Sequence, residues 1–155
     1  MISVGFTGHR ILSADEQIAA AAGLHKTIEK LIFMGAENFF AGGALGFDTL
    51  AAQAVLAFRS AGAKVRLHLL LPFPEQDRRW SSDDKAVYRN ILSLADSSEY
   101  FCDRYLPGVY HLRDRAIVER SEIIVAYLNR STGGTAYTVS VAGDMGREII
   151  NLARC

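Results

Sequence analysis

The sequence predicts an α/β protein in which helices cover both faces of a parallel sheet. Three observations carry this prediction. Apolar runs typical of buried strands alternate with helical periodicities, no linker or low-complexity segment interrupts them, and glycine-rich turns follow two of the runs. At 155 residues, of which 50% are hydrophobic and 22% charged, the chain has the size and composition of one globular domain, residues 1–155.

Each expected strand is an apolar run that a turn signal or a helical pattern follows. The first run ends at Gly8, the second at the glycines beginning with Gly42, and the third at Pro72. The fourth run is short, and the last closes the chain. The strands are therefore expected at 2–6, 38–41, 65–71, 100–102, 123–127 and 148–152.

The expected helices are stretches in which apolar residues recur at intervals of three and four. Ser13 and Glu16 have capping-box spacing at the start of the first helix. Thr135 is the expected N-cap of the last helix, and Gly146 is its stop signal. The helices are expected at 14–35, 47–60, 83–95, 109–120 and 135–145.

Charge and composition exclude several classes of protein. The 17 basic residues balance the 17 acidic ones, so no global field attracts nucleic acid or a membrane surface. Cys102 and Cys155 match no zinc-binding spacing, and the histidines are scattered, so no metal site is expected. No apolar stretch is long enough to span a membrane, and residues 1–6 do not look like a signal peptide. We therefore expect a cytoplasmic protein without a membrane partner.

Three turns should meet at one edge of the sheet. They are residues 7–10, 41–48 and 132–135, and each follows an expected strand. Right-handed crossovers put all strand-to-helix loops of a parallel sheet at the same edge, where such sheets bind ligands. Glycine turns at helix N-termini also present backbone N–H groups to anions such as phosphate. The turns therefore indicate a nucleotide-sized ligand, although the glycines could instead only permit close packing of helix and sheet.

Each polar residue near these turns could have either a structural role or a ligand-binding role. Asp48 could favour its helix dipole, or it could bind a ribose hydroxyl. Arg10, after His9, and Arg113 could pair with phosphate or with nearby carboxylates. Trp80 is the single tryptophan, and its ring could stack on a base or pack in an interface.

Several separated motifs together resemble the YpsA-like family, a branch of the superfamily that includes DprA/SMF and the LOG phosphoribohydrolases. They are Thr7-Gly8-His9-Arg10, Gly42-Gly43-Ala44-Leu45-Gly46-Phe47-Asp48, Pro72-Phe73 with Gln76 and Trp80, Arg113-Asp114-Arg115, and Gly133-Gly134-Thr135 with Thr138. The resemblance implies a three-layer α/β/α Rossmann-like fold with strand order 3-2-1-4-5-6. The switch point would lie between the first and fourth strands, and the protein would be a homodimer.

The resemblance also implies which residues bind a ligand. These candidates are Gly8, His9, Arg10, Gly42, Gly43, Gly46, Asp48, Gln76, Trp80, Arg113, Gly133, Gly134, Thr135 and Thr138. The chain departs from the family's pattern at Asp114, where the family motif has Asn. LOG hydrolases carry a catalytic Glu after their glycine turn, whereas residues 136–139 here contain no carboxylate.

The leading hypothesis is therefore binding of a nucleotide or an ADP-ribose-like molecule by a cytosolic sensor or regulator, with no established cofactor. One alternative is LOG-like hydrolysis, with Asp48 or Asp103 as acid or base. The other alternative is DprA-like binding of single-stranded DNA, because residues 42–56 and 133–149 resemble DprA segments.

Overall fold

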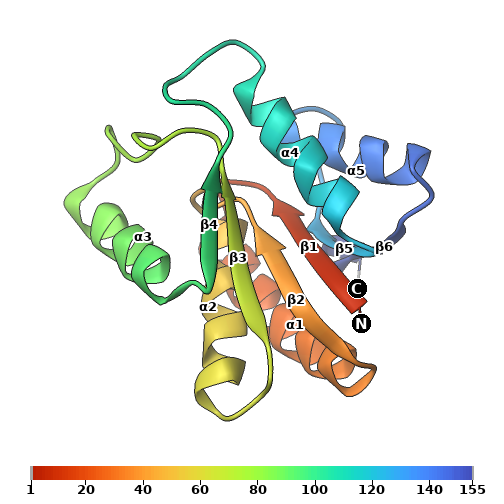
Figure 1. Ribbon diagram of the computed structural model, residues 1–155. Coiled ribbons are helices and arrows are strands. Elements are labelled where there is room, and N and C mark those ends of the chain that lie inside the picture. The colour runs from red at the N-terminus through yellow and green to blue at the C-terminus, as the bar shows by residue number, and fades with distance from the viewer. Residues whose placement is uncertain (1, 155) are drawn as a thin grey trace.

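A computed structural model describes residues 2–154 and confirms an α/β fold with an all-parallel six-stranded sheet between helical layers (Figure 1). The strands are β1 (Ile2–Gly8), β2 (Ala36–Ala41), β3 (Arg66–Leu71), β4 (Ser97–Tyr100), β5 (Ile123–Tyr127) and β6 (Glu148–Asn151). The helices are α1 (Ala14–Phe33), α2 (Phe47–Ser60), α3 (Ser82–Leu94), α4 (Val109–Arg120) and α5 (Gly134–Asp144), followed by a 3₁₀ turn, Leu152–Arg154. Cys155 lies outside the described residues.

The strand order is β4-β3-β2-β1-β5-β6, so the expected order 3-2-1-4-5-6 is wrong in its fourth strand. That strand pairs with β3 at the outer edge, and it spans 97–100 instead of 100–102. Burial explains the difference. All four residues of β4 are exposed, as suits an edge, whereas all five residues of β5 are buried and can occupy the central place beside β1.

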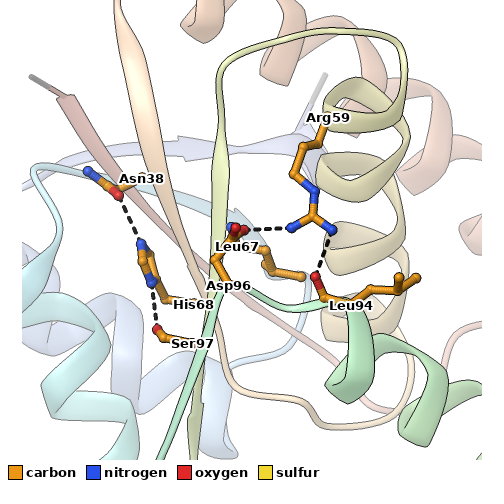
Figure 2. Close-up of polar contacts among 7 residues, drawn as sticks. All are labelled: Asn38, Arg59, Leu67, His68, Leu94, Asp96 and Ser97. Atoms are coloured by element: carbon orange, nitrogen blue, oxygen red, sulfur yellow. Dashed lines mark hydrogen bonds and ion pairs between the residues drawn. The ribbon is translucent and has the colours of Figure 1, made fainter.

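Polar contacts hold the start of β4 against β3 (Figure 2). The Asp96 carboxylate accepts hydrogen bonds from the Leu67 backbone N–H at 2.8 Å and from the Arg59 guanidinium at 2.6 Å. The same guanidinium donates to the Leu94 carbonyl at 2.7 Å. Burial alone would raise the pKa of Asp96, but the Leu67 N–H and Arg59 hold that pKa below its ordinary value. The ion pair thus links α2 and α3 to the edge of the sheet.

A second polar contact crosses three strands on the opposite face of the sheet. The His68 ring lies between the Asn38 side chain, at 2.8 Å, and the Ser97 hydroxyl, at 2.6 Å (Figure 2). The ring also stacks on Phe40, with centroids 5.0 Å apart. These contacts connect β2, β3 and β4 where β4 itself contributes no buried side chain.

The helices form two layers with separate apolar cores. α1, α2 and α3 pack on one face, where Phe6 and Phe39 stack at 6.0 Å inside the larger core. α4 and α5 pack on the other face over a smaller core around Ile117 and Ile124 (Figure 1). None of the helices within residues 2–154 is long and apolar enough to cross a membrane.

The helix starts differ in how they are capped. The capping box predicted at α1 is confirmed, because Ser13 accepts from the Glu16 N–H at 3.1 Å and Glu16 accepts from the Ser13 N–H at 2.9 Å. The cap predicted at Thr135 is wrong. α5 begins one residue earlier, its N-cap is Gly133 at φ 102°, and no side chain caps it. The N-terminal backbone of α5 is therefore left open.

Candidate functional site

A pocket of about 370 Å³ lies where the strand order reverses, at the carboxyl ends of β1 and β5. We call it the crevice. Its walls come from the end of β1 and the loop after it, the turn after β2 with the start of α2, helix α4, and the start of α5. The lining residues are Phe6, Thr7, Gly8, His9, Arg10, Ala44, Asp48, Tyr110, His111, Arg113, Asp114, Ile117, Gly134 and Thr135.

The loop after β1 is packed tightly on the start of α2. The Phe47 N–H donates to the His9 carbonyl at 3.1 Å, and a Cβ on Gly8 would lie 2.3 Å from the Phe47 ring. A Cβ on Gly46, which has φ 75°, would lie 2.4 Å from the Arg10 carbonyl oxygen. These two glycines are therefore required by packing. That is the structural reading that the sequence left open for them.

His9 lines the crevice and also connects two of the loops around it. Burial lowers the pKa of its ring, and the nearby Arg130 lowers it further, so the imidazole is neutral at pH 7. Its Nε2 accepts the backbone N–H of Asn129 at 3.1 Å. His9 thereby ties the loop after β1 to the loop after β5.

The turn after β2 is held by two side chains from other elements. Arg113 Nη1 donates to the Gly42 carbonyl, and Gln76 Nε2 donates to the Gly43 carbonyl at 3.2 Å. Arg113 is 4% exposed, and its Nε also donates to Asp114 at 2.7 Å. Arg113 therefore fixes the shape of the crevice, and its guanidinium is already engaged with the protein.

Asp48 is the buried carboxylate of the crevice. It lies in the first turn of α2, is 7% exposed, and accepts the Ala44 N–H at 3.2 Å. Burial raises its pKa to about 6, although Arg113 and the Ala44 N–H oppose that rise. The oxygens of this side chain can accept a hydrogen bond from a ligand hydroxyl.

Arg10 is the exposed cation at the mouth of the crevice. Its guanidinium carbon lies 5.0 Å from the centre of the Tyr110 ring. The guanidinium carbon of Arg113 lies 5.9 Å from the centre of the same ring. Within residues 2–154, no carboxylate forms an ion pair with Arg10. Arg10 can therefore offer its charge to a ligand without breaking an ion pair within the described residues.

The start of α5 forms the opposite wall. No described residue accepts a hydrogen bond from the Gly134 or Thr135 backbone N–H. A Cβ on Gly134 would meet only an Asp114 oxygen, at 3.7 Å, so its neighbours do not require a glycine there. The Thr138 hydroxyl donates to the Gly134 carbonyl at 2.8 Å and is directed within the helix. The residues that carry these two open N–H groups line the crevice and lie at the positive end of a helix.

The structure divides the sequence-predicted residues into three groups. Those that line the crevice are Gly8, His9, Arg10, Asp48, Arg113, Gly134 and Thr135. Gln76 and Trp80 instead line a neighbouring cavity, where Trp80 packs edge-on against Tyr88 at 5.2 Å. The third group does not line the crevice: Gly42, Gly43, Gly46 and Gly133 lie in the turns, and Thr138 lies within α5.

Sequence reasoning missed Tyr110 and His111 as crevice residues. Both lie in the first turn of α4, and His111 stacks on Tyr137 of α5 at 4.0 Å. Their aromatic character was the only available signal, since α4 reaches the crevice by crossing from β4, at the outer edge, to β5. No cluster of three His, Cys, Asp or Glu side chains able to hold a metal occurs among residues 2–154.

A family model described as the YspA SLOG family, under the name YpsA, matches residues 14–148. The chain belongs to the YpsA family of SLOG proteins. A UPF0398 protein of Bacillus cereus (strain G9842) is 28% identical over 126 residues, which cover 79% of this chain and 68% of that protein. The SPbeta prophage-derived protein YoqJ of Bacillus subtilis (strain 168) is 30% identical over 117 residues, covering 68% of each chain.

Solved structures of DprA share the fold of this YpsA-family protein. DprA of Streptococcus pneumoniae aligns with a TM-score of 0.70 and 21% identity over 96% of this chain and 49% of the DprA chain. DprA of Helicobacter pylori aligns with a TM-score of 0.67 and 16% identity over 96% of this chain and 63% of the other. The chain thus spans about half the length of the pneumococcal protein.

The raised pKa of Asp48 predicts a change in stability with pH. The Asp48 carboxyl has a pKa of about 6 in the folded protein and an ordinary pKa of 3.8 in the unfolded chain, so the folded protein binds the proton more tightly. Through this group, the free energy of unfolding of the wild type falls as pH rises from about 4 to about 6, by about 2–3 kcal/mol. Asp48→Asn keeps an oxygen for the Ala44 N–H but does not titrate. Between pH 4 and pH 7, the free energy of unfolding of the variant should therefore rise by about 2–3 kcal/mol relative to that of the wild type.

Urea denaturation at a series of pH values measures this difference. The exposed Asp15→Asn substitution is the matched control for the change from carboxylate to amide. A difference between Asp48→Asn and wild type that stays constant from pH 4 to pH 7 would contradict the burial of an ionised Asp48.

Proposed function

We propose that the crevice binds a nucleotide or a nucleotide-derived small molecule, with its phosphate at the start of α5. One observation carries the proposal. Gly134 and Thr135, whose N–H groups have no acceptor among residues 2–154, line the same pocket as Arg10, which has no ion pair there. Open helix N-termini and guanidinium groups are both strong binding partners of phosphate.

The rest of the crevice suits the sugar of such a ligand. Asp48 offers a buried acceptor for a ribose hydroxyl, and a carboxylate that is partly desolvated forms strong hydrogen bonds. The volume of about 370 Å³ lies in the usual range of small-molecule sites. Adenosine monophosphate and ADP-ribose are therefore the first ligands to test.

The residues of the crevice favour binding over catalysis. Its carboxylates are Asp48 and Asp114, and Asp114 already pairs with Arg113. Residues 136–139, which follow the α5 turn, are Ala-Tyr-Thr-Val and supply no acid or base. We propose a cytosolic sensor or regulator, acting as a homodimer, whose ligand changes its stability or its contacts instead of being consumed.

Gly134→Val tests the phosphate position. The new side chain has space, so the fold should persist, but it should block the open N–H groups at the start of α5. We expect AMP or ADP-ribose to raise the melting temperature of the wild type, and at least a tenfold loss of affinity in the variant. Gly43 is a poor test position, because a Cβ there would lie 2.5 Å from Leu71.

The matched control is Gly143→Val. It adds the same side chain to the same helix, at an exposed position where a Cβ meets nothing within 4 Å. Calorimetric titration should give this variant the affinity of the wild type. Equal affinity for all three proteins would refute phosphate binding at α5.

Hydrolysis of the ligand is the second candidate function, because the raised pKa of Asp48 is typical of a general acid or base. One carboxylate without a second partner should give no rapid release of base. We therefore expect AMP and ADP-ribose to remain intact during long incubation, as followed by chromatography. Product that forms with wild type and disappears with Asp48→Asn would make the protein an enzyme.

Binding of single-stranded DNA is the third candidate, since the H. pylori DprA structure was described for its single-stranded DNA binding mode. This chain has a formal net charge of zero, and long-range attraction to a polyanion requires an excess of basic residues. We expect weak binding of a labelled oligonucleotide at physiological salt, as measured by fluorescence anisotropy. Tight binding with a steep salt dependence would favour this candidate over ours.

A further inference from the structure

A second cavity of about 620 Å³ lies beside the crevice. It is formed by the loop between β3 and α3 and the loop between β4 and α4, which lie at the carboxyl ends of these strands (Figure 1). We call it the aromatic cavity. Its lining residues are Phe73, Glu75, Gln76, Arg78, Arg79, Trp80, Asp103, Arg104, Tyr105 and Tyr110.

Aromatic rings form much of its wall. Phe73, Tyr105 and Tyr110 contact one another, with centroids 6.0 to 6.3 Å apart. Trp80 is fixed by its edge-on contact with Tyr88 of α3. Tyr105 is 58% exposed, so most of its surface is free to receive a ligand. Flat bases stack well on exposed aromatic rings of this kind.

The charges around the aromatic cavity suit an anion. Three guanidinium groups line it, and one of them, Arg78, lies 3.8 Å from Glu75 in an exposed ion pair. Arg79 and Arg104 form no ion pair with any residue from 2 to 154. Asp103 lines the same cavity and can accept a hydrogen bond from a hydroxyl group.

The crevice and the aromatic cavity share a wall. Tyr110 lines both, and on the crevice side it contacts the Arg10 guanidinium at 5.0 Å. Gln76 lines the aromatic cavity while its Nε2 holds the Gly43 carbonyl in the turn after β2. The two spaces therefore adjoin at Tyr110.

We propose that the aromatic cavity is a second nucleotide subsite and that the ligand is a dinucleotide, two nucleosides joined through phosphate. The inference rests on the proposed function of the crevice. One nucleotide places its phosphate at α5, and the second stacks its base against Tyr105 and Trp80 with Arg79 and Arg104 near its phosphate. The two linkages with this chemistry are a 5′,5′-pyrophosphate and a 3′,5′-phosphodiester.

Trp80 provides a direct test, because it is the only tryptophan of the chain. Diadenosine 5′,5′-diphosphate and the 5′-phosphorylated dinucleotide pApA represent the two linkages, and AMP is the mononucleotide. We expect at least one dinucleotide to bind tenfold or more tightly than AMP in calorimetric titration. That dinucleotide should also change Trp80 fluorescence excited at 295 nm, whereas AMP should leave it nearly unchanged.

Tyr105→Ala and Leu106→Ala form a matched pair of variants. Both residues are exposed in the same loop, but only Tyr105 lines the aromatic cavity. Tyr105→Ala should weaken binding of the dinucleotide at least fivefold and leave AMP unchanged, whereas Leu106→Ala should change neither.

Three outcomes would overturn the inference: no advantage of either dinucleotide over AMP, no response of Trp80, or an equal effect of both variants. If AMP binds normally in such a case, the proposed function of the crevice stands and only the second subsite is lost. If neither AMP nor a dinucleotide binds, both proposals fall.

Discussion

The place between β1 and β6, covered by helices on both faces, is taken by the one described strand whose side chains are all buried. β1 lies in the middle of the sheet, and both of its neighbours are covered by helices. β5, with five buried residues, fits this place, and β4, with four exposed ones, does not. The chain must therefore cross from the outer edge to the centre after β4. α4 makes this crossing, and it brings Tyr110 and Arg113 to the turns after β1 and β2.

The same crossing explains why the two arginines of the crevice differ in burial and in their contacts. Arg113 is buried and holds the Gly42 carbonyl, whereas Arg10 is exposed and lacks an ion pair within residues 2–154. The glycine turns are likewise of two kinds. Gly8 and Gly46 permit close packing on α2, while Gly134 begins a helix whose first N–H groups remain open. The turns after β1 and β2 are thus held by contacts within the fold, whereas the first N–H groups of α5 have no acceptor among residues 2–154.

Much of the fold followed from the sequence, because the strands and helices carry strong local signals. The bounds of α2, α4 and β5 agree with the expected ones, and the capping box at Ser13 is present. The strand order was wrong because it depends on which strands can be buried together, which a short run such as residues 97–102 does not reveal. Tyr110 was missed because its place depends on the path of α4. Trp80 is separate from the crevice because it follows β3, which lies two strands away from β1.

The central claim is that α5 and Arg10 hold the phosphate of a nucleotide. Titration of ¹⁵N-labelled protein with AMP, followed by backbone amide chemical shifts, measures this most directly. The account predicts the largest shifts at the Gly134 and Thr135 amides, together with the Arg10 side chain. Shifts confined to the loops 73–80 and 103–106, or no shift at the start of α5 at saturating AMP, would contradict it.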